Sequence, residues 1–357
     1  MTISASLEHL SGTPVLVAGG AGFVGSALCR ELLRHGASVS VFDSLLHGSE
    51  ANLTGLDLQS FVGDACEAET LDRCLQRIRP ELVVNCMGDT FVTSAYDHTL
   101  RFLRNNVEAT HNLLRSARRV GVTRILQLSS TEVYDARSGQ PLNERTALNP
   151  LNSYAVTKLA ADRLCATMCV ESGIPVLIAR LFNCYGPRET HAYLIPEIID
   201  QLHRGDQLIL GSLHAARDFT YVEDTARALT ALLVADAAPG SVVNIGSGIA
   251  YSVAEIAGAI GAIMRPEGFS LHSDPRRFRR REIERFQCDY RRLHQLTGWQ
   301  PRTTLTDGLR QTIDWYREND ACWPWKHAAS ERPLALIDKP ALEPIADQLV
   351  QSSWRPR

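Results

Sequence analysis

The fold of this chain is decided by residues 14–43, which read PVLVAGGAGFVGSALCRELLRHGASVSVFD. The stretch begins with the apolar run PVLVAG (14–19), continues with a helical pattern over residues 23–35, and ends with the apolar run SVSVFD (38–43). Short apolar runs of this length predict buried strands, and the periodic segment between them predicts a helix. A strand, a helix and a second strand in this order form a βαβ unit, whose two strands lie parallel in one sheet.

The same alternation continues along the chain. Apolar runs at 82–86, 124–130 and 175–181 predict further buried strands, and helical patterns separate them. We therefore predict an α/β fold with a doubly wound parallel sheet that helices cover on both faces.

The second half of the chain has a less regular pattern. Helical segments near 194–204, 222–235 and 252–264 alternate with short strands at 207–210 and 241–246. We interpret this part as chain shared between the sheet and a smaller C-terminal lobe that covers the substrate.

Composition narrows the class of protein. The 357 residues carry a formal net charge of -3, which gives no reason to expect nucleic acid or a membrane surface as partner. The first residues, MTISASLEHLSG, contain no basic region of a signal peptide, and no apolar run is long enough to span a bilayer. The nine cysteines are scattered and form no CxxC pair, which predicts a cytoplasmic protein with reduced thiols and no structural zinc.

A glycine-rich turn links the first strand to the first helix. It reads AGGAGFVG (18–25), and its glycines have the GxxGxxG spacing of dinucleotide-binding turns in Rossmann-type sheets. Glycine allows the tight turn and lets a diphosphate approach the backbone, where the helix N-terminus offers free N–H groups. The predicted cofactor-binding residues of this turn are Gly19, Gly22, Phe23, Val24 and Gly25.

A carboxylate at the end of the second strand selects the cofactor. Asp43 can accept hydrogen bonds from a ribose 2′-OH and would repel a 2′-phosphate. The following residues, SLLHG, contain no arginine, so we predict NAD rather than NADP. Asp64 could contact the adenine by analogy of fold, and read alone it is equally a loop carboxylate. The alternative for the whole turn is a glycine-rich loop that binds no nucleotide.

The catalytic residues are predicted from a second motif. YAVTK places Tyr154 and Lys158 four residues apart within a helical pattern, so that both lie on one face of the helix. A nearby ammonium stabilises a phenolate and lowers the pKa of the tyrosine toward that of a general base. Ser130 ends the strand at 124–130, on the sheet edge where ligands bind, and can orient a substrate oxygen.

Taken together, these motifs resemble those of a known family. GGAGFVG, SSTEVY, YAVTK, RLFNCYGPR (180–188) and RDFTYVEDT (217–225) are similar to the motifs of the extended short-chain dehydrogenase/reductases. These are NAD-dependent nucleotide-sugar epimerases, dehydratases and decarboxylases. The resemblance runs in order from about residue 13 to about residue 318.

The resemblance implies the chemistry. Tyr154 would remove the proton of a sugar 4-hydroxyl while hydride passes from C4 to NAD, which is regenerated in each cycle. Lys158 would tune Tyr154 and hold the nicotinamide ribose, and Ser130 would bond the 4-oxygen. Arg277, a candidate for substrate binding, lies in the basic run RRFRRR (276–281). We interpret the other residues of this run as a solvated surface. The residues implied for substrate binding are Asn183, Arg188, Arg217, Arg277 and, from TFVTSAYDH (90–98), Thr93.

Glu132 favours one reaction of the family. The 4,6-dehydratases resemble this chain in placing a glutamate there, where it can take the C5 proton of a 4-keto sugar as the 6-hydroxyl leaves. Thr131 stands where dehydratases carry an aspartic acid or a serine. The segments 185–202 and 210–225 also resemble dehydratases that act on nucleotide-linked N-acetylglucosamine. We therefore predict a 4,6-dehydratase acting on a nucleotide-linked hexose or N-acetylhexosamine.

Other readings stay open. A 4-epimerase, a nucleotide-glucuronate decarboxylase and a non-catalytic NAD-binding protein are alternatives, and decarboxylases also carry such a glutamate. NCMGD (85–89) replaces the His-x-Ala of the family, and Asp135 replaces a glycine. Helical patterns near 98–119 and 152–172 pair across a dimer interface in the family, so a homodimer is implied.

The predicted organisation has three parts. Residues 1–183 form a Rossmann-type NAD-binding domain that includes the catalytic serine, tyrosine and lysine. Residues 184–318 form mainly a substrate-binding lobe, with some chain returning to the sheet. Residues 319–357 form a C-terminal extension to which the sequence assigns no role.

Overall fold

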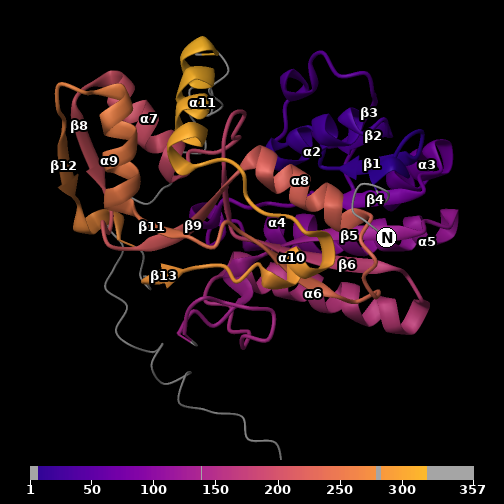
Figure 1. Cartoon of the computed structure of the whole chain (residues 1–357). Coiled ribbons are helices and arrows are strands. Elements are labelled where there is room, and N and C mark those ends of the chain that lie inside the picture. The colour runs from indigo at the N-terminus through magenta and orange to yellow at the C-terminus, as the bar shows by residue number, and fades with distance from the viewer. Residues whose placement is uncertain (1–6, 138, 279–282, 320–357) are drawn as a thin grey trace, which may run out of the picture.

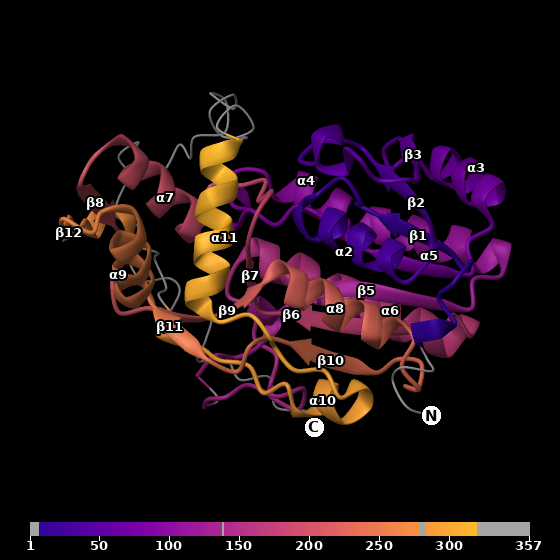
Figure 2. The ribbon, with the colours of Figure 1, turned by 45° about the horizontal axis from the view of Figure 1, so that its top comes forward.

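Figures 1 and 2 show two lobes in a computed structural model that describes residues 7–137, 139–278 and 283–319. The larger lobe is built on a seven-stranded sheet with the order β10-β6-β5-β4-β1-β2-β3, in which every neighbouring pair is parallel. This order and the covering helices confirm the predicted doubly wound α/β fold. The strands are β1 (Pro14–Ala18), β2 (Ser38–Asp43), β3 (Gln59–Val62), β4 (Leu82–Asn85), β5 (Arg124–Ser130), β6 (Val176–Leu181) and β10 (Val242–Ile245).

Both faces of this sheet are buried, which explains its continuous apolar runs. Because successive side chains point to opposite faces, Val15 and Val17 of β1 join one core cluster and Leu16 joins the other. The predicted strands are confirmed. β3 was not predicted, because its side chains are largely exposed and form no apolar run. The first cluster packs against α2 (Phe23–Arg34) and α8 (Val222–Leu233), and the second against α3 (Ala68–Ile78), α5 (Ala109–Val120) and α6 (Ser153–Ser172).

The helix predicted near 98–119 has a break in it. It consists of α4 (Thr99–Leu103), a π-helical turn (Arg104–Glu108) and α5. The wider turn points Asn106 inward, where its amide donates to the Asp89 carbonyl oxygen at 3.0 Å and to Thr157 Oγ1 at 2.8 Å. Thr157 belongs to α6, so the π-turn fixes the helix that carries the predicted tyrosine and lysine.

The smaller lobe has its own core. Ile198, Leu208, Ile260 and Ile313 are fully buried in it. Figure 2 shows this lobe on the side of the molecule away from β3. Its elements are β7 (Asn183–Tyr185), α7 (Leu194–Arg204), β8 (Gln207–Leu210), β9 (Ala216–Tyr221), β11 (Ala250–Ser252), α9 (Val253–Met264), β12 (Ser270–Ser273), β13 (Arg285–Phe286) and α11 (Leu305–Glu318).

The chain beyond residue 183 contributes to both lobes. α8 packs on the large sheet beside α2, and β10 pairs with β6. A further helix, α10 (Arg291–Thr297), is followed by Trp299, whose indole N–H donates to the Asp224 carbonyl oxygen at 3.0 Å. Chain beyond residue 183 thus lies in both lobes, while the division into domains stays a prediction. Apart from Asn319, the segment predicted as a C-terminal extension lies outside the described residues.

A buried carboxylate helps to join the two lobes. Asp218 of β9 accepts hydrogen bonds from the N–H and hydroxyl of Ser247, at 2.7 and 2.6 Å, and from Gly248 N at 2.8 Å. It also accepts one from Cys288 N at 3.0 Å. Burial raises the pKa of Asp218, and these hydrogen bonds lower it. The carboxylate thus ties β9 to the loop after β10 and to the segment after β13.

We expect Asp218→Asn to lower the free energy of unfolding by about 2–4 kcal/mol, because an amide would aim N–H groups at backbone N–H donors. Asp314→Asn is the control, because Asp314 is 64% exposed and its substitution should change stability by less than about 0.5 kcal/mol. Urea unfolding measures both. Equal stabilities of the two variants would show that Asp218 does not join the lobes.

Candidate active site

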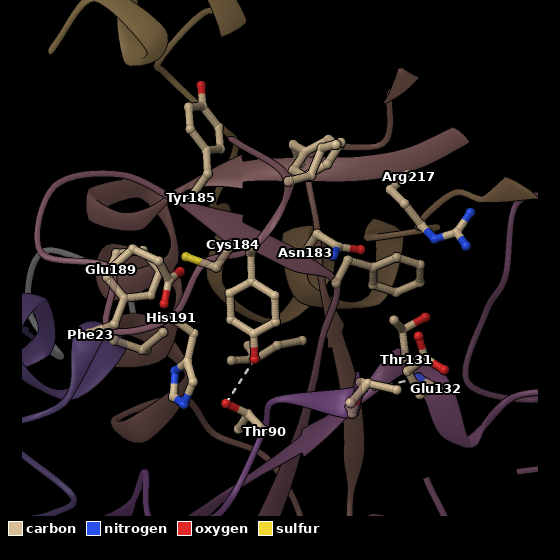
Figure 3. Close-up of a pocket in the computed structure, with 18 of the residues that line it drawn as sticks. Phe23, Thr90, Thr131, Glu132, Asn183, Cys184, Tyr185, Glu189, His191 and Arg217 are labelled. Atoms are coloured by element: carbon tan, nitrogen blue, oxygen red, sulfur yellow. Dashed lines mark hydrogen bonds between the residues drawn. The ribbon is translucent and has the colours of Figure 1, made fainter. Parts of the chain in front are cut away.

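A cavity of about 410 Å³ lies between the lobes at the carboxyl ends of the parallel strands. Gly19 follows β1, Cys86 follows β4, Ser130 ends β5, and Asn183 follows β6, and all four line the cavity. Figure 3 shows Thr131 and Glu132 after β5 on one side of the cavity, and Asn183, Tyr185 and Arg217 of the smaller lobe on another. Strand ends at a topological switch point are where doubly wound sheets bind ligands.

The glycine turn fits a bound diphosphate. A Cβ added to Gly25 would lie 2.1 Å from the Gly19 carbonyl oxygen, so β1 and α2 approach each other only if this residue is glycine. Gly19 has a φ of +81°, and an added Cβ there would lie 2.7 Å from the Cys86 carbonyl carbon. α2 begins after Gly22, which has no side chain to cap its first N–H groups. Those groups face the cavity, which Phe23 and Val24 also line, and suit the diphosphate of NAD.

The two acidic residues predicted for the cofactor have different surroundings. Asp43 accepts from Ala21 N at 2.9 Å and from Leu45 N at 2.8 Å, so it holds the glycine turn against β2. Burial raises the pKa of Asp43, and the two backbone N–H groups oppose that shift. Asp64 is exposed and accepts from Cys66 N at 2.8 Å. Neither carboxylate is among the residues that line the cavity, and contact with ribose or adenine stays a prediction.

The structure brings Ser130, Tyr154 and Lys158 together at the cavity wall. α6 begins after Asn152, whose side chain caps Ala155 N, and therefore presents Tyr154 in its first turn. Burial raises the pKa of Tyr154 above its usual value, and the hydrogen bond with Ser130 lowers it. The net direction is opposite to the predicted one, because burial and the carboxylates of Glu132 and Asp162 raise the pKa by more than the Ser130 hydrogen bond lowers it.

Lys158 is held by the strand that ends at Ser130. Its Nζ donates to the Leu128 carbonyl oxygen at 3.4 Å. Burial lowers the pKa of Lys158, whereas the nearby Asp162 carboxylate raises it. The ammonium also lies close to the backbone of Gly88, where an added Cβ would be 3.2 Å from Nζ. Lys158 thus reaches the cavity between β4 and β5, beside the glycine turn.

Glu132 is coupled to the helix that carries the tyrosine. Thr131 and Glu132 lie in the short helix Thr131–Val133 after β5, and both line the cavity. Asn152 Nδ2 donates to Glu132 Oε2 at 2.9 Å while Asn152 Oδ1 caps α6, so one side chain positions both Glu132 and Tyr154. The buried Thr131 hydroxyl has no hydrogen-bond partner among the residues described.

Two of the predicted arginines line the cavity and one does not. Arg217 donates to the carbonyl oxygens of Ala216 at 2.9 Å and Ile283 at 2.8 Å, which orients its guanidinium along the wall (Figure 3). Arg277 lines the cavity and pairs with Glu197 at 3.0 Å. Arg188 lies elsewhere, in a recess of about 20 Å³ that Arg30 also lines.

Three other predictions concern residues near this wall. Asn183 is exposed and lines the cavity as predicted. Thr93 lies in the short helix Val92–Ser94, and its side chain is outside the described part of the structure. Asp135, which replaces a glycine of the family, pairs with Arg137 at 3.0 Å and is not among the cavity residues.

The sequence missed a group of residues on the cofactor side. Tyr193 donates to Thr90 Oγ1 at 3.0 Å, the dashed line at Thr90 in Figure 3, and so joins the loop before α7 to the loop after β4. His47 pairs with the buried Asp89, which also accepts from Arg101 at 3.1 Å. Glu189 and His191 complete this wall. No spacing in the sequence relates these loops, because each contact joins distant segments.

Known proteins were compared with the chain. Residues 15–246 match the family described as the NAD dependent epimerase/dehydratase family. A low-salt glycan biosynthesis protein of Haloferax volcanii is 34% identical over 86% of this chain and 99% of its own. An epimerase structure from Methanothermobacter thermautotrophicus has a TM-score of 0.84 and 29% identity, covering 89% of this chain and 96% of its own. A dTDP-glucose 4,6-dehydratase structure from Streptomyces venezuelae, with NAD and TYD bound, has a TM-score of 0.79 and 29% identity, covering 87% and 98%.

Gly25→Ala should weaken NAD binding by about 10- to 100-fold, because the new Cβ must push the Gly19 carbonyl out of the turn. The measurement is the dissociation constant of NAD by titration calorimetry. Gly258→Ala in α9 is the control, since an added Cβ there meets nothing within 4 Å. Wild-type affinity in the Gly25→Ala protein would contradict this role of the turn.

Proposed function

Because the chain belongs to the NAD-dependent epimerase/dehydratase family, we propose that it is a nucleotide-sugar 4,6-dehydratase that works through a 4-keto intermediate. The observation that carries the proposal is Glu132, which lines the cavity close to Ser130 and is held by Asn152 at 2.9 Å. A carboxylate beside the hydroxyl that bonds the 4-oxygen can reach the proton on the neighbouring C5, which a 4-keto group makes acidic.

NAD is the cofactor, and this chain offers it the turn Gly19–Gly25, Asp43 and Lys158. When bound, NAD supplies the acceptor for a hydride from the sugar C4 and later the donor that returns it. The turn contributes backbone N–H groups for the diphosphate, and Lys158 contributes an ammonium beside the strand ends of β4 and β5.

The side chains of the proposed mechanism act in order. Ser130 bonds the 4-oxygen and orients it, and Tyr154 accepts the proton of the 4-hydroxyl. Glu132 then removes the C5 proton, and the 6-oxygen leaves as water. Residue 131 is a threonine rather than a carboxylic acid, so it cannot act as the general acid. Glu132 therefore also protonates the departing 6-oxygen. The double bond left between C5 and C6 is then reduced: the hydride taken from C4 returns to C6 and a solvent proton adds to C5. Tyr154 releases the proton of the 4-hydroxyl to solvent, so the net change is the loss of one water.

The substrate we propose is a nucleoside diphosphate linked to a hexose or an N-acetylhexosamine. Arg217 and Arg277 line the cavity on the side of the smaller lobe, together with Asn183. Guanidinium groups suit the oxygens of a diphosphate. The similar protein of Streptomyces venezuelae is named a dTDP-glucose 4,6-dehydratase, which supports a hexose on a nucleotide.

A 4-epimerase is the second candidate. The similar structure from Methanothermobacter thermautotrophicus is named an epimerase, which favours it. In that reaction the same serine and tyrosine would serve the 4-oxygen, the hydride would return to the other face of C4, and Glu132 would only hold Asn152. No water would leave the sugar, so the mass of the substrate would not change.

We further propose that the chain is a cytoplasmic homodimer, with residues 1–183 as its NAD-binding domain and residues 184–318 mainly as its substrate lobe. The eight described cysteines are unpaired, which is consistent with reduced thiols. None of the helices in the described ranges has the length and apolar character that crossing a bilayer requires. Leu100 of α4 is 78% exposed and Val170 of α6 is 86% exposed, which supports an interface on these helices.

The dimer is tested by light scattering after size exclusion. The wild type should elute at twice the 39.4 kDa chain mass, and Leu100→Glu should shift the protein to the monomer by burying a charge in the interface. Ile249→Glu, at a residue 54% exposed outside these helices, should stay dimeric. A monomeric wild type would refute the dimer.

The reaction is tested with Glu132→Gln. We expect the variant to lose water elimination from dTDP-glucose or UDP-N-acetylglucosamine by at least about 100-fold, because the amide cannot take the C5 proton. The first oxidation should survive and appear as absorbance of reduced cofactor at about 340 nm in single turnover. Glu267→Gln, at an exposed glutamate, should behave like the wild type. Full turnover by Glu132→Gln would remove Glu132 from the mechanism.

A further inference from the structure

Glu189 is a buried carboxyl group in the cavity wall that the proposed reaction does not use. It lies in the loop between β7 and α7, and its side chain is only 4% exposed. It nevertheless lines the cavity. A carboxylate withdrawn from water needs a partner of opposite charge or several hydrogen bonds, and otherwise takes up a proton.

The described surroundings of Glu189 offer no positive charge. Among the described residues, Glu189 accepts hydrogen bonds from backbone N–H groups, that of Thr190 at 2.9 Å and that of His191. The ionisable groups that interact with it are Cys184 of β7 and Tyr316 of α11. His191 lies two residues on in the same loop, and the adjacent Arg188 lies in a separate recess. No ion pair joins Glu189 to any residue within the described ranges.

These neighbours do not change their charge near neutral pH. Burial lowers the pKa of His191 to about 4, so the imidazole is neutral. Burial raises the pKa of the Cys184 thiol and of the Tyr316 phenol, so both keep their protons. Burial also raises the pKa of Glu189 itself, to about 8. At pH 7 the side chain is therefore mostly a carboxylic acid with an O–H to donate.

Glu189 lies at the cofactor end of the cavity. Figure 3 shows it on the same side as Phe23, with Thr131, Glu132 and Arg217 on the other side. Phe23 is the first residue of α2, whose N-terminus faces the diphosphate site. Phosphate and ribose oxygens accept hydrogen bonds there. A carboxylate beside them would repel the phosphates, whereas a carboxylic acid can donate to them.

We propose that Glu189, in its protonated form, donates a hydrogen bond to an oxygen of the diphosphate–ribose part of bound NAD. Cofactor binding is then linked to one proton, because loss of that proton removes the donor and sets an anion against the diphosphate. The inference goes beyond the proposed reaction and holds whether the chain is a dehydratase or an epimerase.

The test measures the dissociation constant of NAD for the full-length protein between pH 6.5 and 9.5. Wild-type affinity should be constant at low pH and should fall above about pH 8, by up to about 10-fold per pH unit, since the protonated form is lost as pH rises through that pKa. Glu189→Gln keeps a neutral N–H donor, so it should bind within about 3-fold of the wild type at pH 7 and lose the decline.

Glu189→Ala removes the donor and should bind NAD about 10- to 100-fold more weakly at every pH. Glu267→Gln is the control for removal of a carboxylate elsewhere and should follow the wild type. A wild-type affinity for NAD that does not change with pH would by itself overturn the proposal. A Glu189→Gln affinity that declines in parallel with that of the wild type would overturn it too.

The same samples distinguish cofactor from substrate. The affinity for UDP should not fall near pH 8 in a way that depends on Glu189. If UDP affinity showed this fall and NAD affinity did not, the hydrogen bond would belong to the substrate and the proposal would be overturned. Because NAD binding requires no turnover, failure of the dehydratase assignment would leave this result unaffected.

Discussion

All parallel strands of the large sheet end at one edge, and this constraint brings the active site together. The edge receives Gly19 after β1, Asp43 at the end of β2, Ser130 at the end of β5 and Asn183 after β6. These residues are far apart in sequence, and only the parallel pairing of the strands makes them neighbours. The glycine turn can be tight at this edge because Gly25 packs directly on the Gly19 carbonyl.

Two side chains fix the geometry of the site. Asn152 bonds Glu132 and caps α6, so the spacing between the carboxylate and Tyr154 does not depend on a flexible loop. Asp218 holds the smaller lobe against the large one, and its neighbour Arg217 lines the cavity. Hydrogen bonds thus hold the polar groups of the site in place before a substrate binds, so these groups need little reorganisation on binding.

The sequence predicted those features that depend on local pattern. The strands 14–18 and 124–130 follow from apolar runs, and the glycine turn from its spacing, because each is encoded within a few residues. The π-turn at Arg104–Glu108 and the carboxyl Glu189 could not be predicted in the same way. A π-turn adds about one residue to a single helical turn, a shift too short to read from the apolar pattern. The burial of Glu189 depends on how its loop packs in three dimensions. The direction of the Tyr154 pKa was wrong for a similar reason, since the depth of burial is a tertiary property.

The claim that most needs testing is that Glu132 makes this site a dehydratase. The direct measurement is the mass of the sugar nucleotide after incubation with the protein in deuterated water, using dTDP-glucose, GDP-mannose and UDP-N-acetylglucosamine in turn. We predict that one of them loses a water and gains a single deuterium, which enters at C5 from the solvent. A product of unchanged mass at a new chromatographic position would contradict it, and would mean that the site inverts C4 and leaves C5 untouched.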